Sequence, residues 1–436
     1  MNSDTGDSLA ATLGITPKQI STGLALFYVC YVLFDCPANL VMTRLNPALW
    51  MSRIVICVAI IGAAHTALSG IASFYTLRLL LGIVIAGMWP GMAYYLTLFY
   101  PPSQTGRRIG MYYTAAQLSA AVVGLVSAGF QKMNGLQGLK GWQWMFLCYG
   151  LITIVVGFAL IWWLPDRPRA PDDPAPQRWW RAKPALTGDD AALHYDELRR
   201  VYNVPPWTVM DLARVAMDWR LYPLTVMYFG VVGVGIGIQS FGTLIIRSTN
   251  PALTPIQLSL LFAPIWIADL IAILIFTPLS DRFHRHRPVF FIGPCCVIIS
   301  GLLVTTFAAN PWARYSGLLI AGFGLGPTVP VCMAWTSEIF QGRHGEVGVA
   351  AATALVSGLG NLGSVTTTYA LYTGWADDME EGKVYRKSNL VMCGVLGLSV
   401  VSAVGMALAV RFVDGGRKRG GEVGGDAEAV GVVRKT

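Results

Sequence analysis

Charged residues are scarce in this chain: of its 436 residues, Asp, Glu, Lys and Arg together make up only 13%, whereas hydrophobic residues make up 54%. Typical soluble domains carry about 25% charged residues. One or two soluble cores do not hold so many apolar side chains. This shortage of charge therefore excludes an ordinary soluble protein and indicates a chain that is surrounded by lipid.

Signals of several functional classes are also missing. The eight cysteines have neither metal-ligand spacing nor the framework of a secreted disulfide protein, so we expect buried thiols, no metal site and no cofactor. No nucleophile and base and no phosphate-binding glycine loop occur in a suitable context, so we expect no catalytic residue and no enzyme activity. The net charge of +8 fits the basic loops of a membrane protein, and we expect no nucleic-acid partner.

Long apolar stretches, by contrast, fill most of the chain. Eleven of them are long enough to cross a bilayer as helices, five before and six after a Pro-rich, charged segment. The predicted spans are residues 20–43, 51–72, 74–99, 108–130, 141–164, 221–246, 256–279, 288–309, 312–338, 347–375 and 389–413. The sequence thus predicts an all-α integral membrane protein.

The order of these segments and the positions of the basic residues predict the topology. We expect a helical bundle at 1–164, a cytoplasmic linker at 165–217, a second bundle at 218–413 and a disordered cytoplasmic tail at 414–436. A short amphipathic helix near 191–202 of the linker is expected to lie on the bilayer surface. Most Lys and Arg residues fall in loops on one side, which places the C-terminus in the cytosol and the N-terminus outside.

Charged residues at membrane depth are the main candidates for function, because each costs about 2.5 to 3.5 kcal/mol on insertion scales unless it is paired or faces water. Arg78 lies one turn inside the third span. It is either a fixed positive charge for an anionic substrate or a coupled proton, or a residue that extends to the outer interface or binds a helix C-terminus. Asp269 lies near the middle of the seventh span with no charge beside it in sequence, which favours a proton-coupling role. Asp35 either titrates or forms a structural ion pair with Arg44 or Arg107.

Uncharged polar and aromatic side chains within the spans are candidates for substrate selectivity. They can bind or stack a ligand if their helix faces point towards a cavity, although ordinary contacts between helices explain them as well. The candidate substrate-binding residues of this kind are Gln117, Gln239, Trp335 and Asn361.

Two basic turns are candidates for a cytoplasmic gate. One holds Asp281, Arg282 and Arg285, and the other holds Arg107 and Arg108. An aspartate at a helix end that faces arginines can form a charge cluster that closes one side of a carrier and breaks when its halves rock. Ordinary positive cytoplasmic loops have much the same composition, so both interpretations stay open.

At these residues the sequence resembles the major facilitator superfamily. The stretch 277–285 resembles the second copy of its loop signature, with Thr277 where glycine is usual, and Arg78 with Gly82 resembles its fourth-helix motif. Between residues 20 and 413 the chain further resembles the fungal anion:cation symporters of the allantoate and vitamin permease type. The motifs that carry this likeness are at 34–39, 78–91, 108–113, 141–146 and 164–168.

This resemblance implies a major facilitator fold of two helical bundles around a central site, with proton-coupled uptake of a small organic anion or vitamin-like carboxylate. Two departures matter. Family members usually carry a glutamate where this chain has Ile85, which weakens the case for coupling through the N-terminal bundle. Their first cavity-lining helix is absent here, so we expect either a truncated gene product or a protein with eleven spans.

The implied partners are a small-molecule substrate, protons and membrane lipid, and we expect a monomer in the plasma membrane. Two alternative functions stay open. One is export of a fungal secondary metabolite, and the other is a transport-impaired membrane protein with eleven spans.

Overall fold

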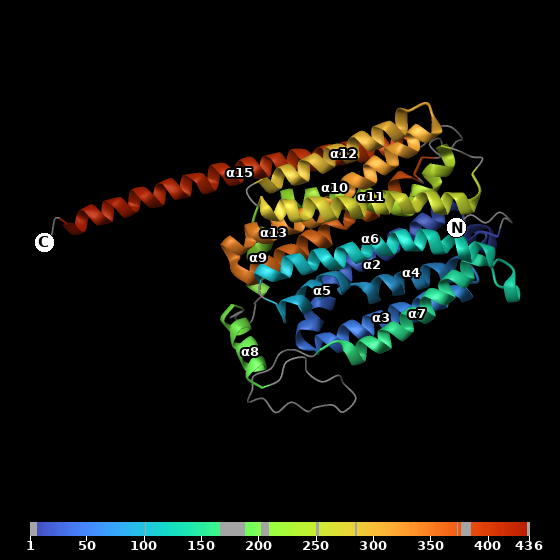
Figure 1. Ribbon diagram of the computed structural model, residues 1–436, viewed down its shortest axis with the longest axis horizontal. Helices are drawn as coiled ribbons and strands as arrows, with labels where there is room; N and C mark the ends of the chain where they lie inside the picture. The colour runs from blue at the N-terminus through green and yellow to red at the C-terminus, as the bar shows by residue number, and fades with distance from the viewer. Residues whose placement is uncertain are drawn as a thin grey trace.

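Helices form all the regular structure in the part of the chain that the computed structural model describes, which comprises residues 7–100, 102–165, 188–201, 209–249, 253–283, 286–372, 374–375 and 385–433. The N-terminal group consists of α2 (Pro17–Arg44), α3 (Pro47–Ala64), α4 (Ile71–Ile85), α5 (Met88–Thr97), α6 (Pro102–Lys132) and α7 (Gly141–Trp163). The C-terminal group consists of α10 (Leu221–Thr249), α11 (Pro255–Arg282), α12 (Arg287–Phe307), α13 (Pro311–Gly360), α14 (Leu362–Thr366), the π-helix η4 (Thr367–Leu371) and α15 (Arg386–Val433). The long helices lie side by side along the long axis of the molecule (Figure 1), and the predicted all-α class is confirmed.

Nine helical stretches among the described residues are long and apolar enough to cross a membrane. They coincide with nine of the predicted spans. The other two predictions, 20–43 and 347–375, fall on α2 and on the stretch that runs from the second part of α13 through α14 and η4. Each predicted span therefore has a helical counterpart in the structure.

The 50-residue element α13 accounts for two of these spans because it folds back on itself. Its Cys332 thiol contacts the Leu224 carbonyl, and Tyr228 packs directly against its Gly360. Residues 224 and 228 are one turn apart on α10, whereas residues 332 and 360 of a straight helix would be about 42 Å apart at 1.5 Å per residue. The chain therefore reverses direction between Cys332 and Gly360.

Two helices at corresponding places in the two groups begin with the same local sequence, Thr-Pro-x-Gln. In α2 the Thr16 hydroxyl accepts a hydrogen bond from the Gln19 backbone N–H (3.3 Å), and the Gln19 side chain accepts one from the Thr16 N–H (2.8 Å). Thr254 and Gln257 repeat this capping box at the start of α11, at 3.3 and 2.9 Å. In both helices proline follows the cap, where it needs no hydrogen-bond partner. The shared start supports a fold built from a repeated unit.

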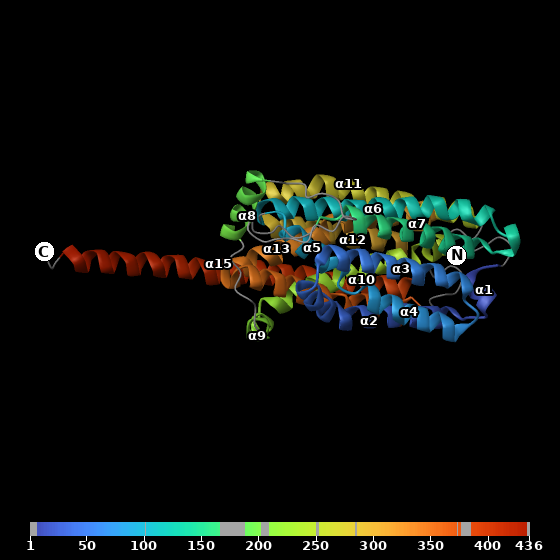
Figure 2. The same ribbon diagram turned by 90° about the horizontal axis from the view of Figure 1, so that it is seen from below.

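The two groups meet along two lines. The first is α6 against α11, which lie next to each other in both views (Figures 1 and 2). The Gln131 side chain near the end of α6 donates to the Ser259 hydroxyl near the start of α11 (3.1 Å). The second line is α2 against α13, α14 and η4. Residues along these two lines are the ones that any relative movement of the groups must rearrange.

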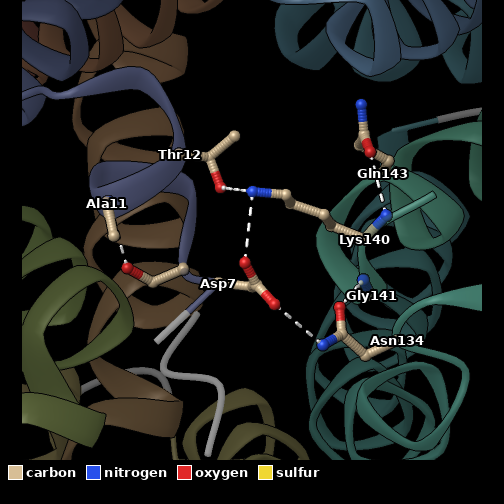
Figure 3. A network of polar contacts seen from close by, with 8 residues as sticks. Asp7, Ala11, Thr12, Asn134, Lys140, Gly141 and Gln143 are labelled. Atoms are coloured by element: carbon tan, nitrogen blue, oxygen red, sulfur yellow. Dashed lines mark hydrogen bonds and ion pairs between the residues drawn. The ribbon is translucent and has the colours of Figure 1, made fainter. Parts of the chain in front are cut away.

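The segment before α2 closes one end of the N-terminal group. It contains the five-residue helix α1 (Leu9–Leu13), and its Ile15 is buried with Leu68, Phe74 and Trp142. A polar network holds the same segment to the turn between α6 and α7 (Figure 3). In it the Lys140 ammonium lies 3.2 Å from Asp7 and 3.0 Å from the Thr12 hydroxyl, and the Asn134 amide donates to Asp7 (3.3 Å).

The linker and the tail differ in part from the prediction. Helix α8 (Asp189–Val201) fits the expected amphipathic helix, and it lies at the end of the bundle opposite α1 (Figure 2). Helix α9 (Val209–Met217), however, packs against α13 and buries Val215, so the linker ends as part of the fold. The tail was expected to be disordered, but α15 is helical to Val433 and extends beyond the bundle (Figure 1). Because this helix continues a preformed span, it needs no new nucleus, while the six glycines at 415–425 each disfavour its extension.

Candidate functional site

Arg78 lies inside the N-terminal group, on α4. Its guanidinium carbon is 5.1 Å from the centre of the Phe74 ring, and the phenol of Tyr28 on α2 interacts with it electrostatically. The side chain is half-buried, and its buried Nε has no hydrogen-bond partner among the described residues. No described carboxylate forms an ion pair with it. A cation in this setting is costly unless an anion or water reaches it.

Asp269 lies between the two helix groups. Its side chain is fully buried, and neither carboxyl oxygen has a hydrogen-bond partner in the described part of the chain. On one side its backbone packs so tightly on α13 that a Cβ on Gly326 would collide with the Asp269 carbonyl. On the other side Tyr113 of α6 is close enough for an electrostatic interaction with its carboxyl.

Asp35 occupies a different setting, at a break between two helices. Its Oδ1 accepts a hydrogen bond from the backbone N–H of Gly87 (2.9 Å), in the two-residue gap between α4 and α5. The side chain is 2% exposed. The sequence suggested two ion-pair partners for Asp35, Arg44 and Arg107. The side chains of both lie outside the described residues.

The four predicted selectivity residues have four different environments. Gln117 is half-buried on α6 and hydrogen-bonds to Tyr113, which places it close to Asp269. Gln239 is exposed on α10. Trp335 is buried within the hydrophobic core of the C-terminal group, and the Asn361 amide donates to the Ser357 carbonyl (2.8 Å) where α13 ends. The structure thus brings only Gln117 towards a predicted charged site.

The predicted gate residues are likewise dispersed. Asp281 pairs with Arg287, whose Nη2 is 3.5 Å from its Oδ1, and all of this contact is within the C-terminal group. Arg282 is exposed, and the Arg108 guanidinium lies 3.6 Å from the Tyr100 ring centre. Arg285 and the Arg107 side chain lie outside the described residues. The gate itself stays a prediction.

Several aromatic residues near these charges were not singled out from the sequence. Trp89, in the first turn of α5, packs edge-on against Tyr112 and Tyr113 of α6, with ring centres 5.0 and 5.4 Å apart. Tyr28 beside Arg78 was also missed. Aromatic residues are frequent throughout the spans, so their identity alone gives no signal of which ones face the meeting lines between the groups.

A metal centre is not supported by the side chains that the structure describes. Among them, no group of three or more His, Cys, Asp or Glu residues is placed to hold an ion. The charged groups at membrane depth are instead single and separated, one on α4 and two carboxyls where the groups meet. Such an arrangement can bind a small charged solute and exchange protons.

The family model of the Major Facilitator Superfamily matches residues 6–368 of this sequence. The chain belongs to that superfamily. Major facilitator proteins with solved structures share its fold: a bacterial homologue of the human lysosomal transporter Spinster has a TM-score of 0.62 at 17% identity, covering 92% of this chain and 91% of that chain. The xylose transporter XylE from E. coli has a TM-score of 0.62 at 13% identity, covering 91% of this chain and 87% of that chain.

Relatives in sequence are also transporters. Vitamin H transporter 1 of Schizosaccharomyces pombe is 45% identical over 418 residues, which cover 92% of this chain and 73% of that protein. A putative tartrate transporter of Agrobacterium vitis is 27% identical, over 84% of this chain and 77% of that protein. This major facilitator protein is therefore a multi-pass membrane protein and a secondary transporter, as the sequence predicts, with the predicted fold.

Proposed function

We propose that this chain takes up a small organic carboxylate together with protons, and that Arg78 binds the carboxylate. The observation that carries the proposal is that the Arg78 guanidinium, inside the helical bundle, has no ion-pair partner among the described residues and that its Nε has no hydrogen-bond partner there. A carboxylate satisfies a guanidinium with two parallel hydrogen bonds, which is the strongest pairing that this side chain forms. A bound carboxylate would thus be the anionic partner of Arg78 that the described residues do not provide.

The surroundings of Arg78 favour a monocarboxylate. A dicarboxylate brings a second negative charge, which also needs a cation. The described groups that interact with Arg78 are the Phe74 ring, the Tyr28 phenol and the His65 imidazole, and His65 already uses its Nδ1 in a hydrogen bond with the Ile61 carbonyl. Vitamin H has one carboxylate and an uncharged ring system, while tartrate has two carboxylates. The relative at 45% identity is named for vitamin H, and the one at 27% for tartrate. We therefore infer a vitamin-H-like monocarboxylate as the substrate.

We assign proton coupling to Asp269. A buried carboxylate without a hydrogen-bond donor is strongly disfavoured, so the neutral acid is the form suited to this conformation. Movement of α11 relative to α6 would expose the group to water, where the charged form is favoured again. One proton would then be taken up and released in each transport cycle. We further propose that the protein lies in the plasma membrane with its N-terminus on the outer side.

Uptake of radiolabelled vitamin H into yeast cells that lack their own carrier tests this function. We expect saturable uptake that a protonophore abolishes and that excess tartrate does not inhibit. Arg78→Gln should lower uptake about 100-fold, because two charge-assisted hydrogen bonds are worth about 3 kcal/mol, and Arg78→Lys should retain a part of it. The matched control is Arg53→Gln, since Arg53 is an exposed arginine on α3 that lies over Trp50.

Two outcomes would contradict the proposal. Normal uptake by both Arg78 variants would show that this residue does not bind the carboxylate. Uptake that continues at full rate with a protonophore present would show that transport is not driven by protons. Equal expression of all variants in the membrane fraction, measured by blotting, makes the comparison valid.

A further inference from the structure

The fourth span is not a continuous helix. α4 ends at Ile85 and α5 begins at Met88. Between them Ala86 has ψ of 139° and Gly87 has φ of +80°. The left-handed conformation of Gly87 is one that glycine adopts without strain and that other residues avoid. A break of this kind leaves the first backbone N–H groups of α5 without partners in their own helix.

A carboxylate from another helix occupies this break. Oδ1 of Asp35 accepts a hydrogen bond from the Gly87 N–H at 2.9 Å, and the two residues are 52 positions apart in sequence. Carboxylates are favourable at helix N-termini because they accept from the free N–H groups and oppose the helix dipole. Asp35 therefore acts as the cap of α5, supplied in trans by α2.

The capped break is fixed at both ends to α2. On the α4 side, Gly82 lies so close to α2 that a Cβ would collide with the Phe27 carbonyl. On the α5 side, Gly91 packs against the Met42 sulfur. Arg78 is one helical turn before Gly82, so the direction in which its side chain extends depends on how α4 leaves this contact.

Asp35 also faces the C-terminal group. A Cβ on Gly358 of α13 would lie 4.0 Å from its Oδ2. Among the described titratable groups, Tyr31, one turn earlier on α2, and Tyr228 on α10 interact with it electrostatically. The cap is thus located on the second meeting line between the groups, where any relative movement changes its surroundings.

We propose that Asp35 is a positioning residue: its carboxylate caps α5 across the break in the fourth span and thereby holds Arg78 in its binding orientation. In this role Asp35 does not carry the coupled proton. It works as a hydrogen-bond acceptor that keeps the start of α5 attached to α2. The inference rests on the proposed function, because it needs Arg78 to bind the substrate.

The test compares variants that keep or lose the acceptor. Asp35→Asn retains an oxygen for the Gly87 N–H, since Asn and Asp cap helices about equally well. Asp35→Ala and Asp35→Leu remove it. For radiolabelled vitamin H uptake, we expect Asp35→Asn to keep the KM within about threefold and the pH profile unchanged, while Asp35→Ala raises the KM about tenfold, as the loss of a helix cap allows.

A binding measurement on purified protein in detergent covers the case in which a variant transports poorly. Vitamin H binding should weaken in Asp35→Ala by the same factor as the KM and stay near the wild-type value in Asp35→Asn. If uptake by Asp35→Asn no longer depended on pH, or if this variant no longer accumulated vitamin H, the inference would be overturned and Asp35 would be a proton carrier. Equal KM values for the Asn and Ala variants would overturn it as well. Wild-type protein that transports no carboxylate would instead refute the proposed function.

Discussion

Nε of Arg287 lies 3.3 Å from a carboxyl oxygen of Glu338, and this ion pair ties the start of α12 to α13. The same guanidinium reaches Asp281 of α11 at 3.5 Å. Its side chain is 9% exposed, whereas each of the two carboxylates is 48% exposed. A single arginine thus links three helices of the C-terminal group at the end that the charge distribution predicts to be cytoplasmic.

Arg287→Gln should destabilise this end of the group. Breaking a buried ion pair costs about 3–5 kcal/mol, but the exposed carboxylates can be hydrated, so we expect about 1–2 kcal/mol. Thermal unfolding of the purified protein in detergent measures the change. The exposed Arg282 is the matched control, and Arg282→Gln should change the unfolding temperature little. An equal loss in both variants would show that overall charge, rather than this ion pair, is responsible.

Gly82→Ala should separate α2 from α4. Its new methyl group would collide with the Phe27 carbonyl and lie 3.0 Å from the Cys30 Cβ, so we expect a loss of about 1–3 kcal/mol from overpacking. At Gly62 of α3, a Cβ would meet nothing within 4 Å, so Gly62→Ala should be neutral or slightly stabilising. Thermal unfolding and vitamin H binding, measured on both variants, test the difference. Similar stability of the two would mean that α2 and α4 are not in close contact.

Lys140→Gln should loosen the segment that precedes α2. The lysine is 34% exposed and its partner Asp7 is 39% exposed, so salt and water screen the pair and the expected loss is below about 1 kcal/mol. The segment also keeps its apolar contacts through Ile15. Limited proteolysis from the outer side of sealed vesicles should therefore cut near Asp7 faster in the variant, with a smaller difference in high salt. No change in the cleavage rate at low salt would contradict the role of this contact.

Asp269→Asn should uncouple transport from protons. The amide is close in size to the neutral acid, so the fold should persist, but it cannot release a proton. We expect exchange of labelled for unlabelled vitamin H across proteoliposomes to continue, while uphill accumulation driven by a pH gradient is lost. Asp189→Asn, at an exposed aspartate of α8 outside the spans, is the matched control and should retain accumulation. Accumulation of normal extent in Asp269→Asn would remove this residue from the coupling path.

The sequence alone predicts the elements because lipid imposes a simple rule on them. A span must satisfy its backbone hydrogen bonds internally, so each long apolar stretch becomes a helix. The starts of α2 and α11 are equally local, since a threonine, a proline and a glutamine complete each cap within four residues. The loop signature at 277–285 and the motif around Arg78 and Gly82 together indicated the superfamily, which the family comparison then confirmed.

The roles of individual polar residues depend on contacts that no local pattern encodes. Asp35 and Gly87 are 52 positions apart, and nothing near either residue indicates that one caps the other. Trp335 and Gln239 have side chains of the kind that bind ligands. In the structure, however, Trp335 lies in a hydrophobic core and Gln239 is exposed. The face that a side chain presents depends on how the helices are rotated and crossed, and that is set by packing over the whole bundle.

For this protein, then, hydrophobicity and charge along the chain determined the class and the spans, because the bilayer acts on each segment separately, and short sequence motifs indicated the superfamily. The tertiary structure decided three further points. Arg78 has no ion-pair partner among the described residues, Asp269 is buried where the two helix groups meet, and Asp35 caps a broken helix. These three facts concern neighbours from distant segments. They follow from close packing between helices, which is specified by the assembled bundle and not by any single stretch of sequence.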